Sequence, residues 1–230
     1  MISIIIPAHK EEQNLSILLS HITKVLNRDC AEVIIALSPE SQSYIPAHFE
    51  GKVQLLTCKE KGRAAQMNEG SMLAKGDVLV FLHADVKPPS TFLKDIDKAL
   101  NEGHDAGFFS YKFDKDDFWL NINASFTGRD GMFTGGGDQC LFIRKSIFEK
   151  LGRFNQHQVL MEDFEFFKRM KQAQIRYTII KTDLIVSARK YERNSYLRVN
   201  LSNLLLVILF NLGYPSTKLK SIHDRLIRSS

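Results

Sequence analysis

The sequence predicts an α/β protein in which a mostly parallel central sheet carries helices on both faces. Short apolar runs rich in β-branched residues alternate, over the first hundred residues, with segments whose apolar residues recur every three or four positions. Strands that alternate with helices in this way form parallel sheets covered on both sides. Because the end of the chain shows helical patterning alone, we also expect a helical C-terminal extension.

The first elements establish this alternation. Residues 2–6 form a continuous apolar run, which Pro7 is expected to end. Residues 14–26 have the spacing of an amphipathic helix, with Asn14 as its N-cap. Further strands are expected at 33–37, 53–57 and 78–82, and further helices at 64–74 and at 90–100, the last with Ser90 as its cap.

After residue 105 the pattern is looser. We expect strands at 106–113, 140–143, 177–180 and 184–187, and helices at 118–126, 146–151 and 162–172. No internal repeat and no Pro/Ser-rich linker marks a boundary. The expected organisation is one catalytic domain over 1–190, followed by a basic amphipathic extension over 191–230 that packs on it or lies at a membrane or subunit interface.

Composition and charge limit the classes of partner. The chain has 230 residues, 44% of them hydrophobic, and three scattered cysteines, which fit a globular protein of the reducing cytoplasm. Residues 1–167 hold 18 Lys+Arg against 23 Asp+Glu, whereas residues 168–230 hold 13 against 3. The basic end indicates nucleic acid or an anionic membrane as partner, or simply a solvated face. The longest apolar run, 204–210, is too short to span a bilayer.

Polar residues recur just after the predicted strands, where ligands bind in open parallel sheets. His9 and Glu11 follow the first strand, Ser38 follows the second, and His83 and Asp85 follow the fourth. A single polar residue after a strand is more often an ordinary loop residue or a helix cap. The prediction of a binding site therefore rests on the recurrence of such residues at several strand ends. Asp85 could hold Mg2+ or Mn2+ while substrate phosphates supply other ligands. No P-loop or GxGxxG motif is present, so neither a P-loop ATPase nor a dinucleotide dehydrogenase is supported.

Three further segments are candidates for chemistry. Arg63 stands at the start of a helix, where backbone amides also favour anions, and is expected to clamp a phosphate. Glu162 and Asp163 open another helix, which capping alone would explain, or Asp163 is a general base. The triple glycine at 135–137 indicates a close approach of the backbone, either to a ligand or to another strand. The side chains after it, Asp138 and Gln139, could bind the sugar or lipid whose hydroxyl gives up its proton to the base.

Taken in order, these segments resemble a family 2 glycosyltransferase with the GT-A fold, a Rossmann-like α/β fold. The resemblance covers nearly the whole chain and is closest to a bacterial branch in which His-Ala-Asp stands where other members have DxD. It rests on Ser3–Pro7 with Glu11, Gly62–Asn68, Leu82–Asp85, Gly137–Gln139, Phe148–Gly152, Met161–Asp163, Ser187–Lys190 and Leu212–Pro215.

The resemblance implies an inverting transfer of a hexose-like sugar from a nucleotide-diphosphate donor to an acceptor hydroxyl. Asp85 would hold Mg2+ or Mn2+, Asp163 would be the catalytic base, and Arg63 would neutralise part of the diphosphate. The donor-binding residues would also include Pro7, Ala8, His9, Glu11, Ser38 and Gln66. The acceptor side would be formed by Gly137, Asp138, Gln139 and Glu162.

Two departures from the family pattern affect the donor site. After the second strand the family usually has an Asp-rich stretch, but residues 36–41 contain Glu40 as their only carboxylate, and Lys10 stands where the family often has Asn. These changes leave an alternative function, that of a catalytically weakened nucleotide- or carbohydrate-binding protein of the same fold.

The extension carries six apolar residues on one helical face with basic residues around them. A helix of this kind can lie in a membrane interface beside a lipid-linked acceptor, on the inner face of the cell membrane. The alternative is burial of residues 204–210 against the catalytic domain or a second subunit, as in a homodimer, and the all-round apolarity of that run favours burial. With no nucleic-acid-binding signature, nucleic acid is not expected. The six residues are Leu197, Leu201, Leu204, Leu205, Ile208 and Leu212.

Overall fold

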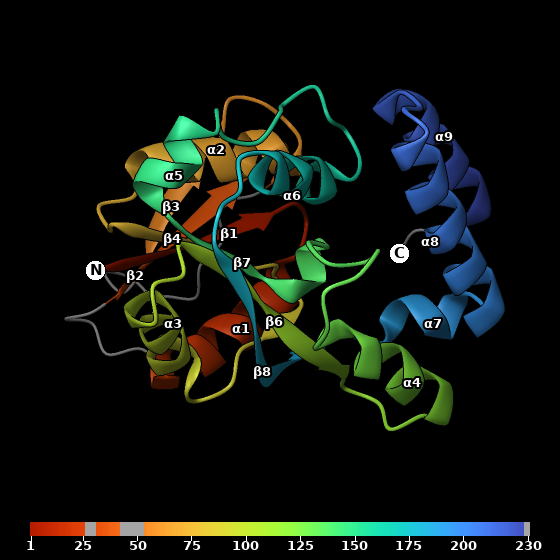
Figure 1. The fold of residues 1–230 in the computed structure, drawn as a ribbon, viewed down its shortest axis with the longest axis horizontal. Helices are drawn as coiled ribbons and strands as arrows, with labels where there is room; N and C mark the ends of the chain where they lie inside the picture. The colour runs from red at the N-terminus through yellow and green to blue at the C-terminus, as the bar shows by residue number, and fades with distance from the viewer. Residues whose placement is uncertain (26–30, 42–52, 228–230) are drawn as a thin grey trace.

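A single sheet runs through the molecule and has helices on both faces (Figure 1). The computed structural model describes residues 1–25, 31–41 and 53–227, and within them the sheet has eight strands in the order β3-β2-β1-β4-β7-β6-β8-β5. The strands are β1 (Ile2–Ala8), β2 (Ala31–Leu37), β3 (Gln54–Thr57), β4 (Val78–Phe81), β5 (Val86–Lys87), β6 (Ala106–Phe113), β7 (Leu141–Arg144) and β8 (Tyr177–Val186). The helices are α1 (Glu12–Val25), α2 (Arg63–Leu73), α3 (Phe92–Asn101), α4 (Phe118–Thr127), the 3-10 turn η2 (Gly137–Gln139), α5 (Lys145–Lys150), α6 (Glu162–Gln172), α7 (Arg189–Arg193), α8 (Tyr196–Asn211) and α9 (Ser216–Leu226).

The N-terminal half of the sheet is parallel. Strand β1 pairs with β2 along its whole length, up to Ala8 opposite Leu37, but with β4 only as far as Ile5. Beyond Ile5 the edge of β1 that faces β4 is no longer paired with that strand. Pro7, which has no N–H to donate, therefore fits inside β1. The prediction that Pro7 ends the strand is therefore wrong, and β1 continues to Ala8.

The C-terminal half mixes directions. Strand β7 lies antiparallel between β4 and β6, and β8 runs parallel to β6. The two strands predicted at 177–180 and 184–187 are one strand, β8, with a register shift opposite the stretch between Phe109 and Tyr111. Ser110 Oγ donates a hydrogen bond to Asp183 Oδ1 at 2.6 Å there. Residues 181–183, which lie between the two predicted strands, therefore form a bulge within β8.

Each face of the sheet has its own helices. Helices α1 and α3 cover one face, where Leu18 and Ile96 pack with Ile4, and α2, α5 and α6 cover the other, where Met67 and Phe166 pack with Ile5 (Figure 1). The side chains of a strand alternate between the faces, so strands buried on both sides are apolar throughout. The predicted α/β fold with helices on both faces is confirmed.

Two predicted helix starts are wrong. Helix α1 begins at Glu12, because Leu15 N already donates to Glu11 O at 2.8 Å, before Asn14 could act as the cap. Helix α3 begins at Phe92 with Thr91, not Ser90, in the N-cap position. Residue 26 of the predicted first helix, Cys30 and residues 228–230 of the extension lie outside the described residues.

Helices α7, α8 and α9 stand together beside the sheet domain (Figure 1). Leu206 and Val207 of α8 pack with Leu219 of α9 and with Met161, which precedes α6. The predicted burial of residues 204–210 is therefore correct for one side of α8, while the opposite side is exposed. In the part of the chain that the structure describes, no helix has the length and apolarity needed to cross a bilayer.

Candidate active site

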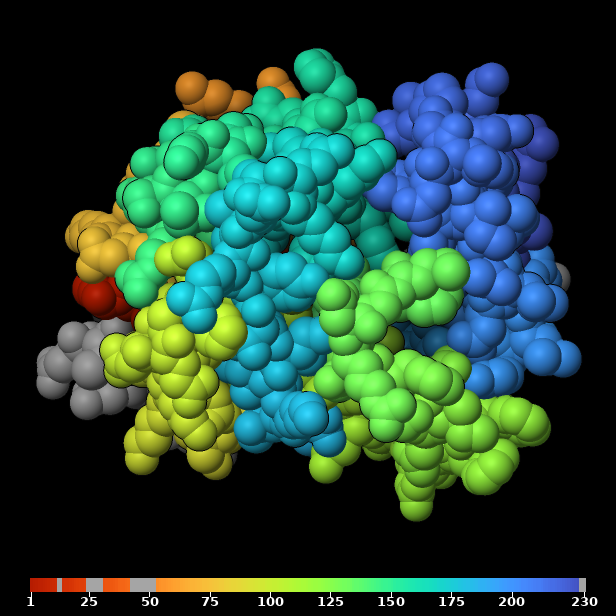
Figure 2. All heavy atoms as spheres, in the orientation of Figure 1, coloured from red at the N-terminus to blue at the C-terminus, as the bar shows by residue number. Residues whose placement is uncertain are grey.

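A cavity of about 900 Å³ lies between the sheet, α6 and the C-terminal helices. Figure 2 shows the C-terminal helices beside α4 and the loop that follows it, and both segments contribute residues to the walls. Several sequence motifs far apart in the chain meet in this cavity. The predicted site residues that line it are Arg63, Asp85, Gly137, Asp138, Gln139 and Asp163.

Strand β4 delivers His83 and Asp85 to the cavity. Burial, then the nearby carboxylate of Asp138, raises the pKa of Asp85 above its ordinary value. His83 Nδ1 lies 3.8 Å from Asp138 Oδ1. Burial acts to lower the pKa of His83, but the carboxylates of Asp138 and Asp163 together outweigh it, so the pKa of His83 is raised. Burial acts to raise the pKa of Asp138, but contact with His83 and the nearby cations outweigh it, so the pKa of Asp138 is lowered. The carboxylates of Asp85 and Asp138 thus face the same cavity, and more than half of the Asp138 side chain is exposed.

Gly137 lets the chain pass between two of these side chains. A Cβ atom on Gly137 would collide with the ring of His83 and would lie 2.7 Å from Asp163 Oδ2. The close backbone approach that the triple glycine predicts is therefore an approach to these side chains. The side chain of Gln139 is used differently from the prediction, because it is buried and bonds to the backbone of Gly135 and Thr127 at 2.9 and 3.0 Å. Gln139 therefore shapes the loop rather than reaching into the cavity for a ligand.

Asp163 lies in the first turn of α6, on the cavity wall. The chain enters this helix through Met161, whose backbone is left-handed (φ 62°), and this turn aims the first helical residues at the cavity. Burial, then the neighbouring carboxylate of Glu162, raises the pKa of Asp163 to about 6. Asp163 is therefore ionised at neutral pH, yet it binds a proton more strongly than an ordinary aspartate, as a general base requires.

Arg63 and Glu162 form an ion pair under the cavity wall. Arg63 Nε lies 2.6 Å from Glu162 Oε1, and the Glu162 side chain is 3% exposed, whereas that of Arg63 is 46% exposed. The neighbouring carboxylates, Glu162 first, raise the pKa of Arg63. Glu162 does not line the cavity. Its contact is with Arg63, whose charge it orients, and its predicted place on the acceptor side stays a prediction.

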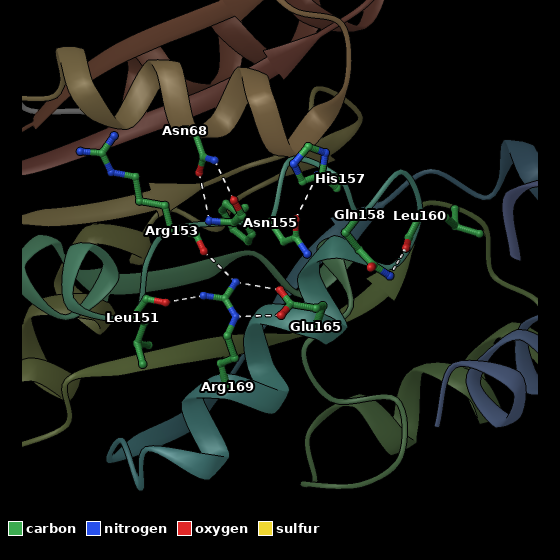
Figure 3. A network of polar contacts seen from close by, with 10 residues as sticks. Asn68, Leu151, Arg153, Asn155, His157, Gln158, Leu160, Glu165 and Arg169 are labelled. Atoms are coloured by element: carbon green, nitrogen blue, oxygen red, sulfur yellow. Dashed lines mark hydrogen bonds and ion pairs between the residues drawn. The ribbon is translucent and has the colours of Figure 1, made fainter. Parts of the chain in front are cut away.

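A polar network holds the segment that leads into α6 (Figure 3). The side-chain amide of Asn68 donates to the carbonyl of Phe154 at 2.8 Å and accepts from its N–H at 3.0 Å. Arg169 donates to the carbonyl of Arg153 at 2.7 Å and to Glu165. Because Glu162 and Asp163 follow this segment, α2 and α6 together fix their position.

Most of the predicted nucleoside residues lie at the ends of β1 and β2, outside the lining of this cavity. His9 Nδ1 lies 2.6 Å from Ser38 Oγ, which joins the two strand ends. Gln66 is buried and donates to the carbonyls of Ala8 and Ala36 at 2.9 and 2.7 Å. The amide of Gln66 is therefore engaged in holding β1 against β2.

The remaining residues near this end are charged. Glu11 Oε1 lies 3.6 Å from Arg189 Nη2, and Arg189 lines the cavity, so Glu11 borders it while Pro7 lies further back in β1. Glu40 pairs with Lys61 at 3.1 Å, which lowers the pKa of Glu40. The single carboxylate after β2 is thus engaged by a lysine.

The cavity also has walls that the sequence motifs did not mark. These come from β6, α4 and the C-terminal helices, and hydrogen bonds join them, since Asn123 Nδ2 donates to Asn200 Oδ1 at 2.8 Å. The one available signal was Asn200 and Asn203, two amides that interrupt an apolar helix. The added lining residues are Tyr111, Asn123, Arg129, Tyr191, Asn200, Asn203 and His223.

The fold and the site together define the class of protein, an α/β protein of the GT-A type. Three aspartates, Asp85, Asp138 and Asp163, line its cavity. Residues 3–176 match glycosyl transferase family 2, and the chain belongs to that family. The family resemblance read from the motifs is confirmed at this level, while the particular branch remains a prediction. A comparison of the chain with curated proteins found no match.

Solved structures with the same fold include two that hold a nucleotide sugar. S. aureus TarS 1-349 in complex with UDP-GlcNAc superposes with a TM-score of 0.67 at 15% identity, covering 98% of this chain and 71% of that one. The mannosyltransferase PcManGT from Pyrobaculum calidifontis, in complex with GDP-Man and Mn2+, gives 0.66 at 17% identity, covering 98% and 69%. Another S. aureus TarS structure superposes with a TM-score of 0.67 at 14% identity, and the match covers 98% of this chain and 42% of that one. At these identities the likeness establishes the fold.

Proposed function

We propose that the protein transfers a sugar, with inversion, from a nucleotide-diphosphate donor to an acceptor hydroxyl, and that Asp163 is the catalytic base. The observation that carries this proposal is Asp163 itself, a carboxylate on the cavity wall whose pKa is raised to about 6. The likeness to structures that hold UDP-GlcNAc and GDP-Man supports a donor of this kind.

A divalent cation fits the carboxylates of the cavity. Burial, and after it the carboxylate of Asp138, raises the pKa of Asp85, so the two carboxylates lie near each other at the cavity. Among the described residues no group of three His, Cys, Asp or Glu side chains is placed to hold a metal. This donor set suits Mg2+ or Mn2+, which bind through one or two carboxylates and take the rest of their ligands from phosphates and water. Asp85 would hold the ion, which when bound stabilises negative charge on the leaving nucleotide.

The chain's own residues account for the other steps. Asp163 accepts the proton of the acceptor hydroxyl as that oxygen attacks the anomeric carbon from the face opposite the nucleotide, which inverts the configuration. Arg63, oriented by Glu162, places a positive charge near the diphosphate. Asp138, beside Gly137, holds the acceptor. We place the nucleoside at the ends of β1 and β2, near His9 and Ser38.

Turnover of UDP-GlcNAc and GDP-Man with and without Mn2+ tests the roles. We expect Asp163→Asn to lower kcat by about 10²- to 10⁴-fold, as for loss of a general base. We expect Asp85→Ala to abolish the response to Mn2+. Asp97→Asn, an exposed carboxylate on α3, is the matched control and should leave turnover unchanged. Equal turnover in all four proteins would contradict the assigned roles.

A second candidate is a nucleotide- or carbohydrate-binding protein of the same fold with weakened catalysis. It is favoured by the end of β2, where Glu40, the only carboxylate, is paired with Lys61. Thermal shift with UDP and GDP, with and without Mn2+, separates the two. Stabilisation together with turnover supports the transferase, stabilisation without turnover supports the binding protein, and no response to any nucleotide argues against both.

A further inference from the structure

Helix α8 presents an apolar stripe that no described residue covers. Leu197, Leu201 and Leu212 are 69%, 63% and 71% exposed, which is unusual for leucines on one face of a helix. Spacings of three and four residues place the other members on the same face. We define the apolar stripe as Leu197, Leu201, Leu204, Leu205, Ile208 and Leu212, all of them exposed.

The opposite side of the same helix is already packed. Val199 is buried, and Leu206 and Val207 contact α9 and the segment before α6. From Leu204 to Phe210 the helix is thus apolar all round, although its own chain buries only one side. A helix with this composition belongs in an apolar environment on both sides, so the apolar stripe lacks its partner. An exposed apolar patch of this size marks an interaction surface.

Aromatic side chains lie beside the start of α8. The ring of Trp119 lies 5.6 Å from that of Tyr196 and 5.3 Å from that of Phe118, and both α4 side chains are exposed. Tryptophan is favoured where an apolar region meets water, because its ring is apolar and its N–H is polar. The surface therefore includes α4 as well as α8.

Charge decides between the occupants of this surface. No charged residue occurs between Arg198 and Lys218, two exposed cations that flank most of the apolar stripe in the sequence. A two-fold dimer places the same patch of each copy face to face, which would bring these cations together. An anionic phospholipid surface neutralises them and accepts the leucines between them.

We propose that the apolar stripe, with Phe118 and Trp119, docks the protein on an anionic phospholipid bilayer. At 16 residues α8 is about 24 Å long, shorter than the hydrocarbon core, so it lies along the interface with Arg198 and Lys218 at the headgroups. The side of α8 that bears Asn200 lines the cavity. Docking therefore brings the active site to the membrane surface, which under the proposed function makes a lipid-linked acceptor accessible.

Co-sedimentation of the full chain with vesicles tests this surface. We expect binding to vesicles of phosphatidylcholine and phosphatidylglycerol at 7:3, and much weaker binding to phosphatidylcholine alone or at high salt. Leu201→Glu should weaken binding by about tenfold or more, since one buried leucine accounts for that much. Lys218→Gln should weaken it by about fivefold. Met72→Glu, a similarly exposed apolar residue on α2, is the matched control and should bind as the wild type does.

The outcomes distinguish the surface from the donor site. No binding of the wild-type chain to anionic vesicles overturns the proposal, as does equal binding by the Leu201→Glu variant. A wild-type dimer in light scattering that Leu201→Glu converts to a monomer, with no vesicle binding, overturns it in favour of a second copy. Thermal shift with UDP and GDP is run on the same samples, so that a protein which binds vesicles but no nucleotide contradicts only the proposed function.

Discussion

Replacing Asp163 with Asn should stabilise the protein while it lowers the rate of catalysis. The pKa of this carboxyl is raised from 3.8 in the unfolded reference to about 6 by burial and by Glu162. A shift of about two units corresponds to about 3 kcal/mol between the charged and neutral forms. Because Asp163 is partly open to the cavity, screening by water reduces this figure, and we expect a gain of about 1–3 kcal/mol, or several degrees in Tm.

The pH dependence of this effect has a definite sign. The folded protein holds the proton of Asp163 more tightly than the unfolded chain does, so the wild type loses stability as pH rises from about 4 to about 6. Above pH 6 the full penalty is present, and below pH 4 it is absent. The variant has no such group, so the difference in unfolding free energy should be near zero at pH 4 and largest at neutral pH.

Denaturant unfolding at pH 4, 5, 6 and 7.5 measures this difference, with EDTA present so that no cation changes the charge of the site. Asp97→Asn is the control, because that carboxylate is exposed on α3 and its removal should change stability by less than about 0.5 kcal/mol. An Asp163→Asn protein that is no more stable than the wild type at pH 7.5, or whose gain does not grow with pH, would refute the assignment of a burial penalty to Asp163.

Three other substitutions test the surroundings of the base. Gly137→Ala should lower kcat by at least about tenfold with little change in donor binding, because its Cβ displaces the ring of His83 from the site, and initial rates with titrated donor would show this. Asn68→Ala should cost about 2–3 kcal/mol in denaturant unfolding, since it leaves two buried backbone groups unpaired. Arg63→Met should cost about 2–4 kcal/mol in denaturant unfolding, because it leaves the buried carboxylate of Glu162 without its cation.

Each of these has a comparison that guards against a general loss of structure. Asn155→Ala removes an exposed amide near the same loop and should cost less than about 1 kcal/mol. Gly131→Ala adds a Cβ where nothing lies within 4 Å and should leave kcat unchanged. An Arg63→Met protein that is as stable as the wild type would contradict a stabilising role of the Arg63–Glu162 ion pair.

Elements with a strong local pattern were predicted within a few residues. The helix predicted at 64–74 is α2 (Arg63–Leu73) and the strand predicted at 78–82 is β4 (Val78–Phe81), both in the first hundred residues, where the alternation is regular. The errors occur where tertiary contacts override a local signal. Pro7 stays inside β1 because the neighbouring strand ends earlier, and the polar residues before Leu184 form a bulge because β6 continues beside them.

The motifs predicted which side chains meet, and less well what each one does. Arg63, Asp85 and Asp163 reach one cavity, as predicted. The side chains of Gln66 and Glu162 are engaged by backbone carbonyls and by Arg63, respectively. Spacing along the chain can place a polar residue at the end of a strand, but it cannot say which partner satisfies that residue once it is buried.

By itself the sequence determined the order of strands and helices, the α/β class and the carboxylates of the site, because periodicity and strand-end positions are local properties. The tertiary structure decided what no local pattern contains: the raised pKa of Asp163, which depends on burial, and the two different sides of α8. Its apolar residues look alike in sequence. Packing against α9 and Met161 covers Leu206 and Val207 and leaves the apolar stripe exposed.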